Sequence, residues 1–99
     1  MEVRLHPLAD DEYWNEVWYY ERISSELADK FKIAVDKTIK QIEKNPFLCH
    51  NRGDGIYSVR VKGFPFTLFY EVLSDEIIVT SVFMQIRDPE IWKSRKGIV

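Results

Sequence analysis

Apolar residues recur along this 99-residue chain with two periods, one helical and one alternating. The clearest helical stretch lies before Asn45-Pro46, where one face carries Leu27, Phe31, Ala34, Val35, Thr38, Ile39 and Ile42. Spacings of three and four residues place these side chains on one stripe, with the charged residues mostly off it. Ser24 and Ser25 are suited to cap the start of this helix, and Asn45-Pro46 ends it.

The N-terminal third predicts a short strand followed by a first helix. Residues 2–8 alternate apolar and polar side chains, and Pro7 marks the end of a strand or an edge of the sheet. Asp10 or Asp11 can cap the following helix, because a carboxylate accepts free backbone N–H groups and suits the helix dipole. Aromatic and aliphatic side chains then recur at helical spacing, at Tyr13, Trp14, Val17, Trp18, Tyr20 and Ile23. We predict that the two tryptophans pack in the core or between the helices.

The second half predicts three strands, over residues 56–62, 66–73 and 77–86. A loop over residues 47–55 precedes them, and its Gly53-Asp54-Gly55 is typical of a turn. Alternation in the first of these strands places Arg60 and Lys62 on one face and Val59 and Val61 on the other. The valine face can be buried, whereas the cationic face must stay in water or meet an anion.

Short connections make the three strands antiparallel neighbours. The sequence therefore predicts an α+β fold, in which an N-terminal strand and a two-helix hairpin precede a three-stranded antiparallel meander and the helices pack on one face of the sheet. We expect a single domain over residues 1–99, because 45% of the residues are hydrophobic and can form one core.

Composition excludes several kinds of bond, site and partner. Cys49 is the only cysteine, which excludes an intramolecular disulfide and fits the cytoplasm. The start of the chain has no long apolar run, so we expect no signal peptide, no membrane span and no membrane partner. His6 and His50 lie far apart without ligand-spaced partners, and no phosphate-binding loop is present, so neither a metal nor another cofactor is expected. A net charge of −2 argues against nonspecific nucleic-acid binding.

Four features occur in a fixed order along nearly the whole chain. They are Asn45-Pro46 before a glycine-containing loop, a strand leading into Gly63-Phe64-Pro65-Phe66, the apolar segment Leu68-Phe69-Tyr70-Glu71-Val72, and a last strand running into Arg87-Asp88-Pro89 and Trp92. In this order they resemble the RelE/ParE toxin superfamily of bacterial type II toxin–antitoxin systems. The Phe-Pro and Arg-Asp-Pro-x-x-Trp signatures are similar to its ParE-like plasmid stabilisation branch.

The resemblance implies a small toxin that is neutralised by a cognate antitoxin. The toxin would form either a homo-oligomer or a heteromeric complex with the antitoxin. ParE-type members inhibit DNA gyrase by binding it, whereas RelE-type members cleave mRNA on the ribosome with basic residues and a tyrosine. Against the ribonuclease pattern, Thr67 replaces an arginine, Ile86 replaces a cation and Trp92 replaces the tyrosine, while Met84 stands where many relatives of the ParE-like branch carry a histidine. A site that works by cationic stabilisation is therefore incomplete.

The candidate site residues follow from the cations and from the resemblance. Arg60, Lys62 and Arg87 are the catalytic candidates, and together with Trp92 they are candidates for contact with the target or the antitoxin. Structural interpretations remain open beside these: a solvated strand face for the first two, a strand-ending turn for Arg87 and packing over a sheet edge for Trp92. Three functions stay in view: a ParE-like toxin that binds its target, a RelE-like mRNA endonuclease, and a non-toxic member that retains only antitoxin binding.

Overall fold

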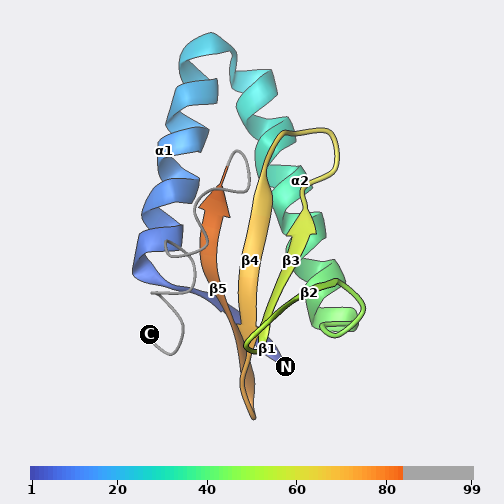
Figure 1. Cartoon of the computed structure of the whole chain (residues 1–99). Coiled ribbons are helices and arrows are strands. Elements are labelled where there is room, and N and C mark those ends of the chain that lie inside the picture. The colour runs from blue at the N-terminus through green and yellow to red at the C-terminus, as the bar shows by residue number, and fades with distance from the viewer. Residues whose placement is uncertain (84–99) are drawn as a thin grey trace.

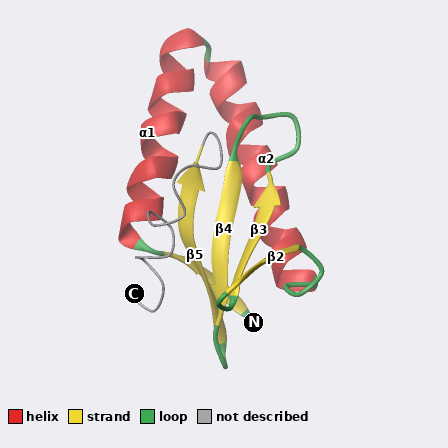
Figure 2. Ribbon diagram, viewed as in Figure 1, coloured by secondary structure: helices red, strands yellow, loops and turns green. Residues whose placement is uncertain are grey.

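A five-stranded sheet with two helices on one face makes up the described part of the chain, residues 1–83 of the computed structural model (Figure 1). The elements are β1 (Glu2–Leu5), α1 (Pro7–Ile23), α2 (Ser25–Lys44), β2 (His50–Gly53), β3 (Ile56–Arg60), β4 (Thr67–Val72) and β5 (Glu76–Phe83). Figure 2 shows the two helices as one layer and the strands as the other. The predicted α+β architecture is confirmed.

The strands lie in the order β1-β5-β4-β3-β2. Strands β3, β4 and β5 pair antiparallel as predicted, and β1 lies parallel to β5, with Val3 opposite Ile77. Strand β2 corrects the sequence-based expectation of a loop over residues 47–55. It pairs antiparallel with β3, and the turn between them has positive φ at Gly53, Asp54 and Gly55. The predicted turn at these three residues is confirmed, but the strand that precedes it was missed.

Helix α2 forms as its apolar stripe predicts. Ser24 caps it, accepting the Leu27 N–H at 3.2 Å, and Asn45 is its C-terminal cap. The stripe is buried at Ala28, Phe31, Val35, Thr38 and Ile42. On the opposite side, pairs such as Asp36 and Lys40, 3.1 Å apart, lie in solvent. Burial of the stripe against the sheet is therefore the main force that holds α2 in place.

Helix α1 begins earlier than predicted. Its first residue is Pro7 and its cap is His6, whose Nδ1 accepts the Leu8 N–H at 3.0 Å, so neither Asp10 nor Asp11 is the cap. Proline suits the first helical position because its fixed φ is already helical and its missing N–H has no helical partner there. The His6 N–H donates to the Val79 carbonyl at 2.8 Å, which ties the end of β1 to β5.

An aromatic cluster joins both helices to the loop between β3 and β4. Phe31 of α2, which is fully buried, lies with its ring centroid 5.2 Å from Tyr20, 5.3 Å from Phe64 and 5.2 Å from Phe66. Offset and edge-to-face pairs at such spacings add to the stabilisation from burial alone. Phe64 reaches the helices because Gly63 has a φ of +85° and turns the chain back, and the loop is closed by a 2.9 Å bond from the Val61 N–H to the Phe66 carbonyl.

The β3 residues on the sheet face away from the main core are more buried than the cations at the end of this segment, Arg60 and Lys62, suggested. Ile56 and Ser58 share that face with Arg60, yet only 2% of each is exposed. The expectation that this whole strand face stays wet is therefore wrong for its first residues. Arg52 of β2 contributes to their cover, because its Nε donates to Ser58 at 2.8 Å and its guanidinium lies over the Phe69 ring at 5.8 Å. Arg60, at the end of β3, remains exposed.

Tyr70 of β4 fixes the segment that follows α2. Its hydroxyl donates to the Pro46 carbonyl at 2.6 Å, and its ring is fully buried and stacks on Tyr57. Burial first, and then the hydrogen bond with the Cys49 thiol, raise the pKa of Tyr70 above 10.0. The neutral phenol is therefore the form that the fold holds.

Replacing Tyr70 with Phe should lower the free energy of unfolding near neutral pH by about 1–2 kcal/mol, because the Pro46 carbonyl loses its donor. Tyr57→Phe is the matched control: its ring stacks in the same pair, and we expect a loss of less than about 0.5 kcal/mol. Urea denaturation of both variants measures the difference, and equal losses would contradict the assigned bond.

The wild type and the Tyr70→Phe variant should also differ in how their free energies of unfolding depend on pH. The unfolded chain ionises Tyr70 before the folded chain does, so its contribution to stability is complete below pH 10.0 and is lost as the pH rises toward the folded pKa. We expect the stability advantage of the wild type over Tyr70→Phe to shrink above this pH by up to about 1.4 kcal/mol per pH unit. An advantage that stays constant into strong alkali would show that the folded pKa is not raised.

Candidate functional site

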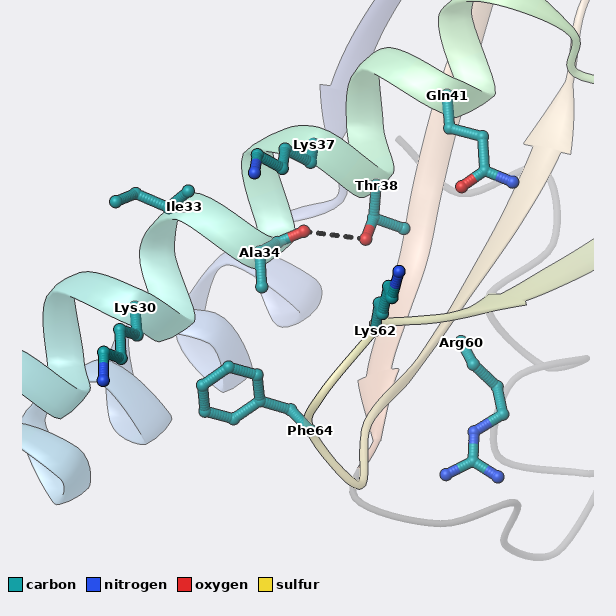
Figure 3. A pocket seen from close by; sticks show the side chains of 9 residues that line it. All are labelled: Lys30, Ile33, Ala34, Lys37, Thr38, Gln41, Arg60, Lys62 and Phe64. Carbon is teal, nitrogen blue, oxygen red and sulfur yellow. Dashed lines mark hydrogen bonds between the residues drawn. The ribbon is translucent and has the colours of Figure 1, made fainter.

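A cationic groove lies between α2 and the end of β3 with the loop that follows it. It encloses about 360 Å³. Helix α2 lines one side with Lys30, Ile33, Ala34, Lys37, Thr38 and Gln41, and the other side is lined by Arg60, Lys62 and Phe64 (Figure 3). These nine residues are what we call the α2–hairpin groove.

The groove has a strong excess of positive charge. Lys30, Lys37, Arg60 and Lys62 line it, and none of its described lining residues is acidic. Lys30 has an exposed partner, Glu26, at 3.3 Å. Within residues 1–83 the other three cations have no ion pair, so their charges are free to attract an anionic group.

Apolar and neutral polar groups complete the groove. Ile33 is 55% exposed, more than any other large aliphatic side chain of α2, and the Phe64 ring is half-buried at the opposite wall. The Thr38 hydroxyl donates to the Ala34 carbonyl at 2.8 Å, whereas the side-chain amide of Gln41 has no hydrogen-bond partner in the described part of the chain (Figure 3). A ligand that fits would combine negative charge with an apolar group and hydrogen-bonding atoms.

The structure brings Arg60 and Lys62 to one groove but not to one strand face. Strand β3 ends at Arg60, and Lys62 lies in the loop beyond it. In Figure 3 the Lys62 ammonium points toward α2, while the Arg60 guanidinium points away from it. Two of the predicted site residues thus border the groove from different directions, and Arg87 and Trp92, with Met84 and Ile86, lie outside the described residues.

The neighbour of Arg60 on β4 is Thr67, directly across the ladder and only 6% exposed. A hydroxyl there can accept or donate a hydrogen bond, but it carries no charge to stabilise a phosphoryl group. Of the described residues that line the groove, none is a histidine, a tyrosine or a carboxylate that could move a proton at neutral pH.

Sequence reasoning missed the part of the groove that α2 supplies. Lys30, Ile33, Lys37 and Gln41 recur at three- and four-residue spacing, so they share a face of the helix beside the buried stripe. The signal was an isoleucine among lysines on the face beside the apolar stripe. Only the position of the β3–β4 loop turns that face into one wall of a groove.

The two tryptophans of α1 are surface residues, which corrects the prediction that they pack in the core. Trp14 is 40% exposed and Trp18 is 59% exposed, with ring centroids 6.4 Å apart. The core face of α1 is instead taken by Tyr13, Val17 and Tyr20. Since each residue advances about 100° around a helix, the tryptophans, one position later, point to the side of that face.

Within residues 1–83, no group of three or more His, Cys, Asp or Glu side chains is arranged to hold a metal ion. None of the helices described is both long enough and apolar enough to span a membrane.

Known proteins match this arrangement at the level of family and fold. Residues 3–89 match the model of the ParE toxin of the type II toxin–antitoxin system parDE. The chain belongs to the ParE toxin family. No curated protein matches it.

Solved structures share the fold of this ParE-family chain. A chain of the chromosomal ParDE toxin–antitoxin system from P. aeruginosa is 14% identical, with a TM-score of 0.63, over 87% of this chain and 97% of that one. The isolated RelE toxin of E. coli is 16% identical, with a TM-score of 0.58, over 99% of this chain and 98% of that one. At these identities the likeness concerns the fold, and it agrees with the RelE/ParE superfamily resemblance of the sequence.

Mutagenesis can show which groove side chains of the ParE-family chain contribute to its stability. Lys37→Ala and Lys62→Ala should each change the free energy of unfolding by less than about 0.5 kcal/mol, because both side chains are exposed and unpaired in the described residues. Phe64→Ala should cost about 2–3 kcal/mol, because it removes ring contacts with Tyr20 and Phe31. Thermal or urea unfolding measures all three, and a comparable loss in a lysine variant would show that the groove charges are structural.

Proposed function

We propose that this chain is the toxin of a type II toxin–antitoxin pair, that it acts by binding a cellular protein, and that a cognate antitoxin neutralises it. Membership of the ParE family supports the toxin role and the antitoxin partner. DNA gyrase is the target that the family resemblance suggests, and the cytoplasm is the compartment in which such a target would be met.

The observation that carries the binding mode is the chemistry of the α2–hairpin groove. Its cations can attract an anionic partner, but its described lining offers no histidine, tyrosine or carboxylate to transfer a proton, and the cross-strand neighbour of Arg60 is the uncharged Thr67. Metal-independent RNA cleavage needs a base for the 2′-hydroxyl and an acid for the leaving oxygen, in addition to charge stabilisation. These features favour binding over an endonuclease of the RelE kind.

Expression of the chain without an antitoxin in a bacterial host tests this function. We expect growth arrest with intact mRNA, together with inhibition of gyrase supercoiling by the purified protein. Arg60→Ala/Lys62→Ala should relieve the arrest, because it removes two groove cations whose charge contacts with a partner are typically worth 2–5 kcal/mol each when buried on binding.

Lys40→Ala/Lys44→Ala is the matched control, since it removes the same charge from α2 outside the groove. It should leave growth arrest unchanged. Ribosome-dependent mRNA cuts that disappear with Arg60→Ala would favour the endonuclease instead. Unimpeded growth with folded protein would indicate a member that retains only antitoxin binding.

A further inference from the structure

Helix α1 carries a line of exposed side chains with opposite charges at its two ends. Asp11, Trp14, Trp18 and Arg22 follow one another at spacings of three and four residues, so they share one face of the helix. All four side chains are exposed, whereas the buried Val17 lies off this line. We call these four exposed residues the α1 outer face.

An open pocket, which we call the aromatic pocket, lies on the N-terminal part of this face. It encloses about 590 Å³ and is lined by Asp11, Trp14, Asn15 and Trp18. The two indole rings have centroids 6.4 Å apart, and the Trp14 ring packs edge to face with Tyr13 at 5.1 Å. A carboxylate beside two indole rings attracts a cation through its charge and through the ring quadrupoles. A guanidinium suits such a pocket best, because it is planar, stacks on aromatic rings and pairs with carboxylates.

The two charges of the α1 outer face are not neutralised within the described part of the chain. Over residues 1–83, neither Asp11 nor Arg22 forms an ion pair. They lie about 16 Å apart along the helix, at 1.5 Å per residue, which is too far for them to pair with each other. The other acids of α1 lie about a quarter of a turn or more from this line, at Asp10, Glu12, Glu16 and Glu21. The pocket can therefore accept a cation, and Arg22 an anion, from another molecule.

The α1 outer face is complementary to itself when a second copy lies antiparallel to it. Trp14 and Trp18 are centred on Glu16. Asp11 and Arg22 are centred within half a residue of the same position. A two-fold axis through this position brings Arg22 of each copy to the Asp11 end of the other, and it brings the indole rings of both copies together in the middle. Both copies then make the same contacts, as a closed dimer requires.

We propose that two copies of this chain associate through their α1 outer faces, antiparallel about a two-fold axis near Glu16, with the Arg22 guanidinium of each copy in the aromatic pocket of the other. A second copy satisfies both charged ends of the face, whereas a small cation or a basic peptide would fill only the pocket. The inference goes beyond the proposed function, because α1 contributes no residue to the α2–hairpin groove. The dimer therefore carries two such grooves, one on each copy.

The area of the face sets the strength of the dimer. An aromatic side chain buries roughly 150–250 Å², so the half-exposed indole rings of both copies supply on the order of 300–500 Å². Stable interfaces bury about 1,200 Å² or more in total. The exposed Leu8, Tyr19 and Ile23 border the face and add to the buried area. We therefore expect a weak dimer, with a dissociation constant on the order of 10 μM.

Sedimentation velocity of the full chain, from about 1 μM to about 1 mM, tests the dimer. Asp11→Lys and Arg22→Glu each place like charges opposite one another at both ends of the interface, and each should weaken the dimer about 100-fold. An equimolar mixture of these two variants should dimerise within about fivefold of the wild-type affinity, because the mixed dimer restores an opposite-charge pair at both ends. Trp18→Ala should also weaken the dimer about 100-fold, because it removes one ring from each copy. Lys44→Glu on α2, an exposed cation away from this face, is the matched control and should change the affinity by less than about twofold.

Three results would overturn the proposal. The first is a wild type that stays monomeric up to about 1 mM. The second is a dimer that Arg22→Glu and Trp18→Ala leave unchanged, although their melting curves show that both variants are folded. The third is a pair of weakened charge variants, Asp11→Lys and Arg22→Glu, whose mixture does not recover the dimer. Because none of the substituted residues lines the α2–hairpin groove, each of these results would leave the proposed function intact.

Discussion

The packing of Phe31 against the rings of Tyr20, Phe64 and Phe66 is the interaction on which the rest of the structure depends. Phe31 belongs to α2, Tyr20 to α1, and Phe64 and Phe66 to the loop between β3 and β4, so this one cluster joins elements from three parts of the chain. Every ring is more than half covered, and Phe31 is fully buried. Burial of four aromatic side chains is a large share of the hydrophobic stabilisation available to a chain of this size.

This cluster also positions the candidate site. Phe64 is both a member of the cluster and a wall of the α2–hairpin groove, so the contact that stabilises the fold also sets the distance between α2 and the loop that carries Lys62. The groove cations therefore do not need to organise one another, and within residues 1–83 Lys37, Arg60 and Lys62 have no ion pair. A surface held open in this way has little ordering cost left when a partner binds.

Much of the fold followed from periodicity because local pattern and burial agree. The stripe of α2 and the antiparallel β3–β4–β5 meander are examples, and Ser24, one of the two serines predicted as caps, is the N-cap of α2. Strand β2 could not be found in this way. Its sequence, His50-Asn51-Arg52-Gly53, has neither apolar alternation nor strand-forming residues, and it pairs only because β3 offers an edge. The prediction for Trp14 and Trp18 was wrong although their spacing is helical, because helical spacing alone does not show which of two adjacent stripes faces the sheet.

The candidate site was half visible in the sequence. Arg60 and Lys62 stood out as cations on a strand, but the lysines of α2 looked like an ordinary solvated face. They become part of one site only through the tertiary contact of Phe64 with the helices. The family resemblance contributed the toxin role and the antitoxin, which no arrangement of side chains in residues 1–83 would have suggested by itself.

A crystal structure of the chain bound to a protein partner tests the central claim most directly: that the α2–hairpin groove is a binding surface. The account predicts a carboxylate of the partner near Lys37 or Lys62. A complex in which the partner lies elsewhere, with the groove open to solvent, would contradict it.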